Sequence, residues 1–296
     1  MNKHNDKTNK SALLFQHYLI VFLDILGQRS ILREIKDLPT NDNEKEIFLD
    51  KIRKTIGKVD KLRNAFHDYF DASNAHLPNP ELAPPEHRQE FLSARKSEVY
   101  FYGFSDSIIV AVPLMGNDEN CTAMNGVYSA LFATCGIGFL SLASTITLRA
   151  GLDVGVGTRI EGQEIYGPAL ERAYYIESNL AEYPRLVLGK ELISYLYWVE
   201  NQRCKTRLGI VAKNMARLCR EMIIRDTDGR YMLDFMGKKY KEVADNSIDT
   251  KVVKLACDFV VSQHQKYVQE ENEYLASRYY RLLQYVNSRK KLWGVE

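Results

Sequence analysis

Apolar and polar positions along the chain predict an alternation of strands and helices. Residues 18–23 form a short continuous apolar run, which is typical of a strand buried on both faces. Across residues 43–70, apolar side chains recur at helical spacing and predict an amphipathic helix. Residues 71–88 are rich in proline, so we expect a loop there.

The rest of the chain continues this alternation. Two short strands, 98–102 and 107–112, flank a bend that contains Asp106, which predicts a hairpin. A helix is expected to start at Gly167-Pro168 and to run to about residue 181, because proline is tolerated in the first turn. The other expected elements are a helix at 121–143, strands at 146–156 and 185–188, a helix at 190–200, a hairpin of 222–225 and 231–235 around Asp226-Thr227-Asp228-Gly229, and a long helix at 250–288.

Together these elements predict an α+β fold, an α/β sandwich in which helices flank a mixed, largely antiparallel sheet. We expect three parts along the chain. Residues 1–15 are expected to form a disordered tail, because the first ten residues are polar and charged. Residues 16–200 form the core, with a helical and proline-rich insertion at about 43–95. Residues 201–296 form a C-terminal extension, a hairpin followed by a helix, packed on the core.

One segment is long and apolar enough to raise the question of a membrane. No charged residue lies between Glu119 and Arg149, and this length could in principle span a bilayer. The segment contains several Ser, Thr and Asn residues, and its ends lack basic or aromatic anchors. We therefore expect a buried helix leading into a buried strand, with no membrane insertion.

Charge and cysteine content narrow the class of protein. The chain has 40 basic and 38 acidic residues, and this near-balance argues against a dedicated nucleic-acid surface. Its 5 cysteines form no CxxC pair, so neither a disulfide framework nor a zinc site is indicated. Because the N-terminus also lacks an apolar signal region, we expect reduced thiols in a cytoplasmic protein.

Two acidic residues stand where scaffolds expose reactive groups. Asp24 follows the first buried strand, and Asp106 lies at the bend of the hairpin. Two carboxylates on neighbouring strands suit Mg²⁺ or Mn²⁺, which prefer oxygen ligands and substrate phosphates. The backbone amides of Ile25, Leu26 and Gly27 would be placed to meet a phosphate. The alternative is that each aspartate is a turn or cap residue, which is commoner at strand ends.

Five segments in order carry a resemblance to a known family. They are Phe22-Leu23-Asp24-Ile25-Leu26-Gly27, Phe104-Ser105-Asp106-Ser107-Ile108, Arg149-Ala150-Gly151-Leu152-Asp153-Val154-Gly155, Gly167-Pro168-Ala169-Leu170 with Ala173-Tyr174-Tyr175-Ile176-Glu177, and Tyr183-Pro184-Arg185-Leu186-Val187. Their order and spacing resemble the class III nucleotidyl cyclases, and most of all the bacterial pyrimidine cyclases of the Pycsar anti-phage defence systems. The resemblance covers about residues 18–188, and the later Asp-Thr-Asp-Gly hairpin and terminal helix are also similar to that subfamily.

The resemblance implies a cyclase-like fold and specific roles for a few residues. Asp24 and Asp106 match the two metal carboxylates of the family, with the Ile25 carbonyl as a further ligand, for two Mn²⁺ or Mg²⁺ ions. Members of the family form head-to-tail homodimers with active sites at the interface, so a homodimer is expected. The diffusible product would act on a downstream effector that responds to cyclic nucleotides.

The chain departs from the family pattern at the position that reads the base. Purine cyclases of the class carry a Lys four residues before the second metal aspartate, and this chain has Tyr102 there. A bulky aromatic residue removes the purine contact and suits a smaller pyrimidine base. The alternative is that Tyr102 is simply an aromatic residue of a strand.

A second departure concerns the helix that begins at Pro168. Class III enzymes carry there an Asn that orients the ribose and an Arg that stabilises the transition state. The matching positions hold Glu171 and Tyr175, one helical turn apart on one face, and we expect both to contact substrate. Three arginines are candidates for the cation that stabilises the transition state, and Arg172 is the first choice. The other two are Arg149 and Arg159.

These observations predict an enzyme, a pyrimidine nucleotide cyclase of the phosphorus–oxygen lyase type. Its expected reaction converts UTP to 3′,5′-cyclic UMP and diphosphate as a second messenger in Pycsar antiviral defence, with CTP as the less favoured substrate. One alternative is a non-catalytic cyclase-fold protein that binds a nucleotide or a partner, as Glu171 and Tyr175 indicate. The other alternative is a purine cyclase.

Two further motifs are expected to be structural. The glycine-rich stretch 151–157 lacks the Lys of a phosphate-binding loop, and we expect close packing beneath a helix to explain it. Asp226 and Asp228 lack the later ligands of a calcium loop and are expected to be hairpin turn residues.

Overall fold

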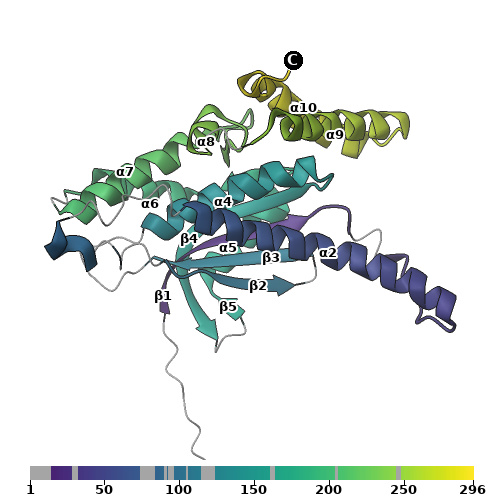
Figure 1. The fold of residues 1–296 in the computed structure, drawn as a ribbon, viewed down its shortest axis with the longest axis horizontal. Coiled ribbons are helices and arrows are strands. Elements are labelled where there is room, and N and C mark those ends of the chain that lie inside the picture. The colour runs from purple at the N-terminus through teal and green to yellow at the C-terminus, as the bar shows by residue number, and fades with distance from the viewer. Residues whose placement is uncertain are drawn as a thin grey trace, which may run out of the picture.

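The structure of the protein is a computed structural model, and it describes residues 15–28, 33–73, 84–89, 92, 97–104, 106–114, 124–160, 164–203, 206–244 and 248–296. Within these residues the chain forms one eight-stranded sheet with helices on its two faces (Figure 1). The predicted tail, apart from Phe15, lies outside the described residues, as does the stretch 74–83 of the proline-rich segment. Cys135, Cys219 and Cys257 are free and buried thiols.

The sheet is mixed and mostly antiparallel, which confirms the predicted α+β class. Its strand order is β2-β3-β1-β4-β6-β8-β7, and β5 pairs with β4. The strands are β1 (Phe15–Ile25), β2 (Tyr100–Phe104), β3 (Ser107–Pro113), β4 (Leu148–Ile160), β5 (Glu164–Tyr166), β6 (Leu186–Leu188), β7 (Ile223–Arg225) and β8 (Tyr231–Leu233). The β4–β6 pair is parallel and the other pairs are antiparallel.

Strand β1 lies between β3 and β4, and this central place explains its continuous apolar sequence. On one face, Leu19, Val21 and Leu23 join the main core. On the other face, Ile20 and Phe22 belong to a smaller cluster. Because alternate side chains of a strand point to opposite faces, both faces of β1 need apolar residues to be buried.

The two faces of the sheet are covered differently. The main core contains residues of seven α-helices, α2 (Asp42–Ala72), α4 (Met124–Ala143), α6 (Lys190–Asn201), α7 (Arg207–Glu221), α8 (Lys238–Val243), α9 (Thr250–Gln269) and α10 (Glu273–Arg289). The smaller cluster is formed with α5 (Pro168–Tyr175) alone among the helices. This second face therefore has the thinner cover, and it is the face on which the candidate site lies.

Helix α4 is the uncharged segment that the sequence predicts to be a buried helix. By length and composition it is the one helix of the described chain that could cross a membrane. In the structure, 89% of its most apolar window is buried inside the protein, against α2, α7 and α9. Burial to this extent is typical of a central core helix.

The C-terminal part differs most from expectation. The predicted single helix at 250–288 is wrong, because the chain turns at residues 270–272 between α9 and α10 (Figure 1). Glu271 takes a positive φ of 54° there, and the Asn272 side chain accepts a hydrogen bond from the Leu275 amide to cap α10. Helix α7, strand β5 and a short helix α8 (Lys238–Val243) are elements that the sequence analysis did not predict.

Close packing of the glycine-rich strand is confirmed. A Cβ atom at Gly151 would lie 2.0 Å from the carbonyl oxygen of Ala173 and 2.6 Å from the amide nitrogen of Glu177. The backbone at the end of α5 therefore rests directly on β4, which only glycine permits at this position. The helix predicted to run to residue 181 continues beyond α5 as one π-helical turn, Ile176–Leu180.

Candidate active site at the Asp24 end of the sheet

The register of β1 and β3 brings Asp24 and the Asp106 hairpin together. Asp24 is opposite Ser107, whose hydroxyl donates a hydrogen bond of 3.3 Å to Asp24 Oδ1. The Ile25 amide donates to the carbonyl oxygen of Asp106 over 3.3 Å. Both aspartates are only 7% exposed. Two carboxylates far apart in the sequence therefore come from adjacent backbone segments at one end of the sheet.

A cation stands on the other side of Asp24. Arg149 on β4 is the register partner of Asp24 on β1. Its Nη2 atom lies 3.5 Å from Asp24 Oδ2 and 2.7 Å from Glu177 Oε1. The three side chains are largely buried, so this is an ion-pair triad of two carboxylates and one guanidinium.

The donor set at this end fits a divalent ion. Within the described residues no group of three or more His, Cys, Asp or Glu side chains is placed to hold a metal. Mg²⁺ typically keeps several waters and is held by one or two carboxylates together with substrate phosphates. Asp24, Asp106 and the backbone oxygens beside them match that pattern, and they would hold the ions.

The expected phosphate contacts of the backbone need correction. The Ile25 amide is used by Asp106, and the Leu26 amide donates to the carbonyl oxygen of Thr147 over 2.8 Å. Both amides are used in hydrogen bonds to neighbouring backbone at the end of β1, so they do not point at an incoming phosphate. Gly27 takes a φ of +87°, a left-handed conformation that favours glycine and turns the chain away from the strand.

Tyr102 shares the thinly covered face with Asp24. It pairs with Ile109 on β3, and Ile109 pairs with Phe22 on β1, two residues before Asp24. Tyr102 packs with the smaller apolar cluster and is partly exposed. Nearby, the Arg159 guanidinium lies 3.5 Å above the centre of the Tyr100 ring. The aromatic residues of β2 therefore lie on the same face as Asp24, with Tyr102 at the level of Phe22 and Tyr100 at the level of Ile20.

The three candidate residues of α5 lie away from Asp24 within the chain. Glu171 and Tyr175 lie on its exposed side, and Tyr175 is 50% exposed. Arg172 donates to Asp153 Oδ2 over 3.0 Å and to the carbonyl oxygen of Val154. Asp153 pairs with Ile20, four residues before Asp24, which is about 13 Å along the strand. Within one chain the structure joins Arg149, and not Arg172, to Asp24.

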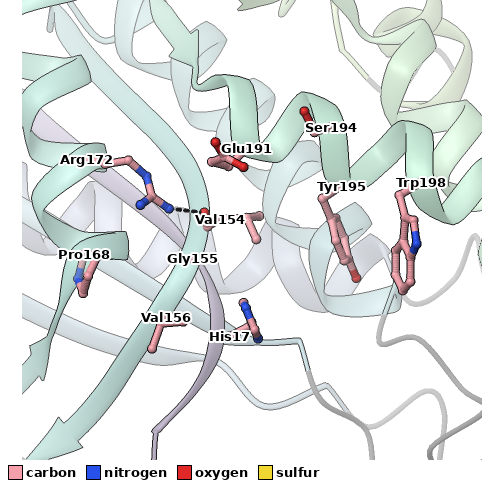
Figure 2. A pocket seen from close by; sticks show the side chains of 10 residues that line it. All are labelled: His17, Val154, Gly155, Val156, Pro168, Arg172, Glu191, Ser194, Tyr195 and Trp198. Atoms are coloured by element: carbon pink, nitrogen blue, oxygen red, sulfur yellow. Dashed lines mark hydrogen bonds between the residues drawn. The ribbon is translucent and has the colours of Figure 1, made fainter.

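Arg172 instead borders a cavity of about 510 Å³ at the opposite end of the sheet (Figure 2). The cavity is lined by His17, Val154, Gly155, Val156, Pro168, Arg172, Glu191, Ser194, Tyr195 and Trp198. Burial raises the pKa of the neighbouring Asp153 carboxyl, although its hydrogen bond from the Leu192 amide opposes the shift. Neither Asp24 nor Asp106 lines this cavity.

Sequence reasoning missed one residue of this site. Glu177 lies in a segment that carries the family resemblance, but no spacing rule links it to Arg149. The two meet because Gly151 lets the π-helical turn approach β4. A buried acidic residue near the end of a helix was the signal available, and it does not identify a partner.

Comparisons with known proteins add structural likenesses only. No family model matches the chain, and no curated protein matches it. Among solved structures, the adenylyl cyclase CyaB from P. aeruginosa is 12% identical with a TM-score of 0.39, and the match covers 75% of this chain and 95% of that one. A bacterial light-regulated adenylyl cyclase is 12% identical with a TM-score of 0.36, covering 79% and 100%. These scores are low, and the function proposed below rests on the geometry of the site.

Proposed function

We propose that the protein is a metal-dependent nucleotidyl cyclase. The observation that carries the proposal is the β1–β3 register, which sets Asp24 beside the Asp106 hairpin with Arg149 against Asp24. Paired carboxylates with an adjacent guanidinium are the groups that phosphoryl transfer uses for positioning and for neutralising charge. The resemblance of the five sequence segments points to the same chemistry.

In this proposal Asp24 and Asp106, with the Ile25 carbonyl, hold two Mn²⁺ or Mg²⁺ ions. Bound there, the ions would lower the pKa of the ribose 3′-hydroxyl and neutralise the triphosphate. The 3′-oxygen forms a bond to the α-phosphorus, the bond from that phosphorus to the bridging oxygen breaks, and diphosphate leaves. The hydroxyl proton passes to solvent.

The structure changes which arginine we propose as the cation of this reaction. Arg149 already contacts Asp24, so its remaining donors lie closest to a phosphate held at that carboxylate. Arg172 is engaged by Asp153 and Val154 and would have to act across a dimer interface. Glu171 and Tyr175 are exposed on the same face and would also meet substrate only across such an interface. A head-to-tail homodimer over the thinly covered face is therefore part of the proposal.

For the base we propose a pyrimidine, with UTP favoured and CTP second. Tyr102 lies on the face of the sheet that carries Asp24. A bulky aromatic residue in place of the purine-reading Lys suits a smaller pyrimidine base. The cytoplasmic location, the signalling role in anti-phage defence and the effector that responds to cyclic UMP follow from the resemblance and are proposed with it.

The test is to incubate the purified protein with ATP, GTP, CTP and UTP, each with Mn²⁺, and to identify products by mass spectrometry. The expected product is cyclic UMP, with less cyclic CMP. Asp106→Asn serves as the inactive control, and Asp50→Asn, an exposed residue paired with Lys54, is the matched active control. Absence of any cyclic nucleotide would reject the proposed activity.

One observation favours a second function, nucleotide binding without turnover. Glu171 and Tyr175 stand where class III cyclases have the Asn and the Arg of the transition state, and neither can replace an arginine cation. A non-catalytic protein of this kind would bind UTP in calorimetry and release no product. The same incubation separates the two functions.

A further inference from the structure

Glu177 is a buried carboxylate behind the candidate active site. It is 3% exposed and belongs to the π-helical turn Ile176–Leu180, a type of turn that is frequent at functional sites. Its Oε1 atom lies 2.7 Å from Nη2 of Arg149, and the same nitrogen lies 3.5 Å from Asp24 Oδ2. One guanidinium nitrogen is therefore placed between two carboxylates and lies closer to Glu177.

The position of Glu177 is fixed by the backbone. At Gly151, two residues from Arg149 on β4, the missing Cβ leaves room for the amide of Glu177 to rest on the strand. Any side chain at Gly151 would push this turn away and lengthen the contact with Arg149. The short distance from Glu177 to Arg149 thus depends on the fold of the core and needs no ligand.

The charges of the triad suggest what Glu177 does. Asp24 and Glu177 carry one negative charge each, and Arg149 carries one positive charge. A divalent ion bound at Asp24 would repel the nearby guanidinium. Without another anion, Arg149 would compete with the ion for the Asp24 carboxylate.

We propose that Glu177 is a positioning residue that draws Arg149 off Asp24 when a metal ion binds. Its carboxylate then keeps the guanidinium beside the ion, where its positive charge can stabilise an incoming phosphate. Asp24 and Arg149 are thereby available to the substrate together and do not neutralise each other. This inference rests on the proposed function for its substrate, but its effect on metal binding can be measured without nucleotide.

The experiment measures Mn²⁺ affinity of the full chain by calorimetry in the absence of nucleotide. In Glu177→Gln the shape is kept and the charge is lost, so Arg149 stays on Asp24 and affinity falls roughly tenfold, the usual loss for an outer-shell carboxylate. In Arg149→Gln the competitor is gone and affinity rises. In the double variant, adding Glu177→Gln changes affinity less than about twofold. Glu164→Gln, an exposed carboxylate on β5, is the matched control and leaves affinity unchanged.

The proposal is overturned if Glu177→Gln lowers Mn²⁺ affinity equally in the presence and in the absence of Arg149. It is also overturned if Glu177→Gln leaves Mn²⁺ affinity unchanged in the protein that retains Arg149. A merely structural role lowers the melting temperature of Glu177→Gln and leaves Mn²⁺ affinity unchanged, which also overturns it. If Glu177→Gln does not fold, Arg149→Gln tests the proposal by itself. Weaker Mn²⁺ binding by Arg149→Gln than by the unchanged protein would then overturn it. If the protein shows the expected Mn²⁺ affinities but makes no cyclic nucleotide, this inference is supported and the proposed function is rejected.

Discussion

The amide of Ile25 donates a hydrogen bond to the carbonyl oxygen of Asp106 over 3.3 Å. This bond closes the end of the β1–β3 ladder, and it holds the backbone that carries Asp24 against the bend of the hairpin. The spacing of the two aspartates is thus set by strand pairing, before any ligand binds. Preorganised charge of this kind is what phosphoryl transfer requires.

Replacing either aspartate should remove catalysis and keep the fold. In Asp24→Asn or Asp106→Asn the shape is unchanged, while a carboxylate that would hold the ions is lost. We expect turnover of UTP to fall at least about a hundredfold, because metal-ion stabilisation is worth several kcal/mol. Initial rates of cyclic UMP formation measure the effect. Near-normal rates in both variants would remove these residues from the mechanism.

Tyr102 should control the choice of base. Tyr102→Ala removes an aromatic ring from the face that carries Asp24, so kcat/KM for ATP relative to UTP should rise by about tenfold or more, the scale of a changed apolar pocket. Competition between the two nucleotides in one reaction measures the ratio. Tyr197→Ala, which removes an exposed ring on α6, is the control and leaves the ratio unchanged. An unchanged ratio in Tyr102→Ala would show that Tyr102 is only a strand residue.

Gly151 should tolerate no side chain. In Gly151→Ala the new Cβ meets backbone atoms of Ala173 and Glu177, so α5 must shift, and we expect a loss of about 1–3 kcal/mol in the free energy of unfolding. Gly57→Ala in α2 adds a Cβ that meets nothing within 4 Å and should stabilise the helix by up to about 1 kcal/mol. Urea unfolding of both variants tests the pair. A stable Gly151→Ala would contradict the close packing.

Arg185 should be one of the most sensitive positions for stability. Its side chain is fully buried, donates to the Leu180 carbonyl over 2.8 Å, and forms ion pairs with Asp226 and Asp228. Arg185→Met leaves both carboxylates without this partner, so the free energy of unfolding should fall by about 3 kcal/mol. Arg217→Met breaks an exposed pair on α7 and should change it by less than about 1 kcal/mol. Equal effects in the two variants would refute this assignment.

The same cluster should make the protein sensitive to acid. Burial opposes it, but hydrogen bonds from Arg185 and Arg230 lower the pKa of Asp228 well below its ordinary value. A carboxylate with a lowered pKa contributes stability above its unfolded pKa of about 4, and that stability is lost as the pH falls toward the folded pKa. Asp228→Asn should therefore flatten the loss of stability below about pH 4. Unfolding curves from pH 7 to pH 2 test this, and an unchanged slope contradicts it.

The strands and helices of the core followed from local patterns. The apolar run before Asp24, the hairpin around Asp106 and the proline-led helix α5 each have a local signal, and the structure has all three. The single C-terminal helix was wrong because periodicity continues through residues 270–272, while the turn there depends on Asn272 as a cap and on packing of α10 against α9.

The site was predictable only in part. That Asp24 and Asp106 lie at one end of adjacent strands could be expected once both strands were assigned. The pairing of Arg149 with Glu177 could not be predicted. It depends on which face of the sheet Arg149 occupies on β4, and on the close approach of a π-helical turn that Gly151 permits. The amides of Ile25 and Leu26 were assigned to a phosphate because nothing local shows that strand pairing extends past Asp24.

Arg185 also links regions that are distant in the sequence. It holds the β7–β8 hairpin through Asp226 and Asp228, and it holds the carbonyl of Leu180, three residues after Glu177. A force applied to the C-terminal hairpin would therefore reach the turn that positions Arg149. Mn²⁺ affinity of Arg185→Met reports this mechanical link, and an unchanged affinity would show that the hairpin and the metal end are independent.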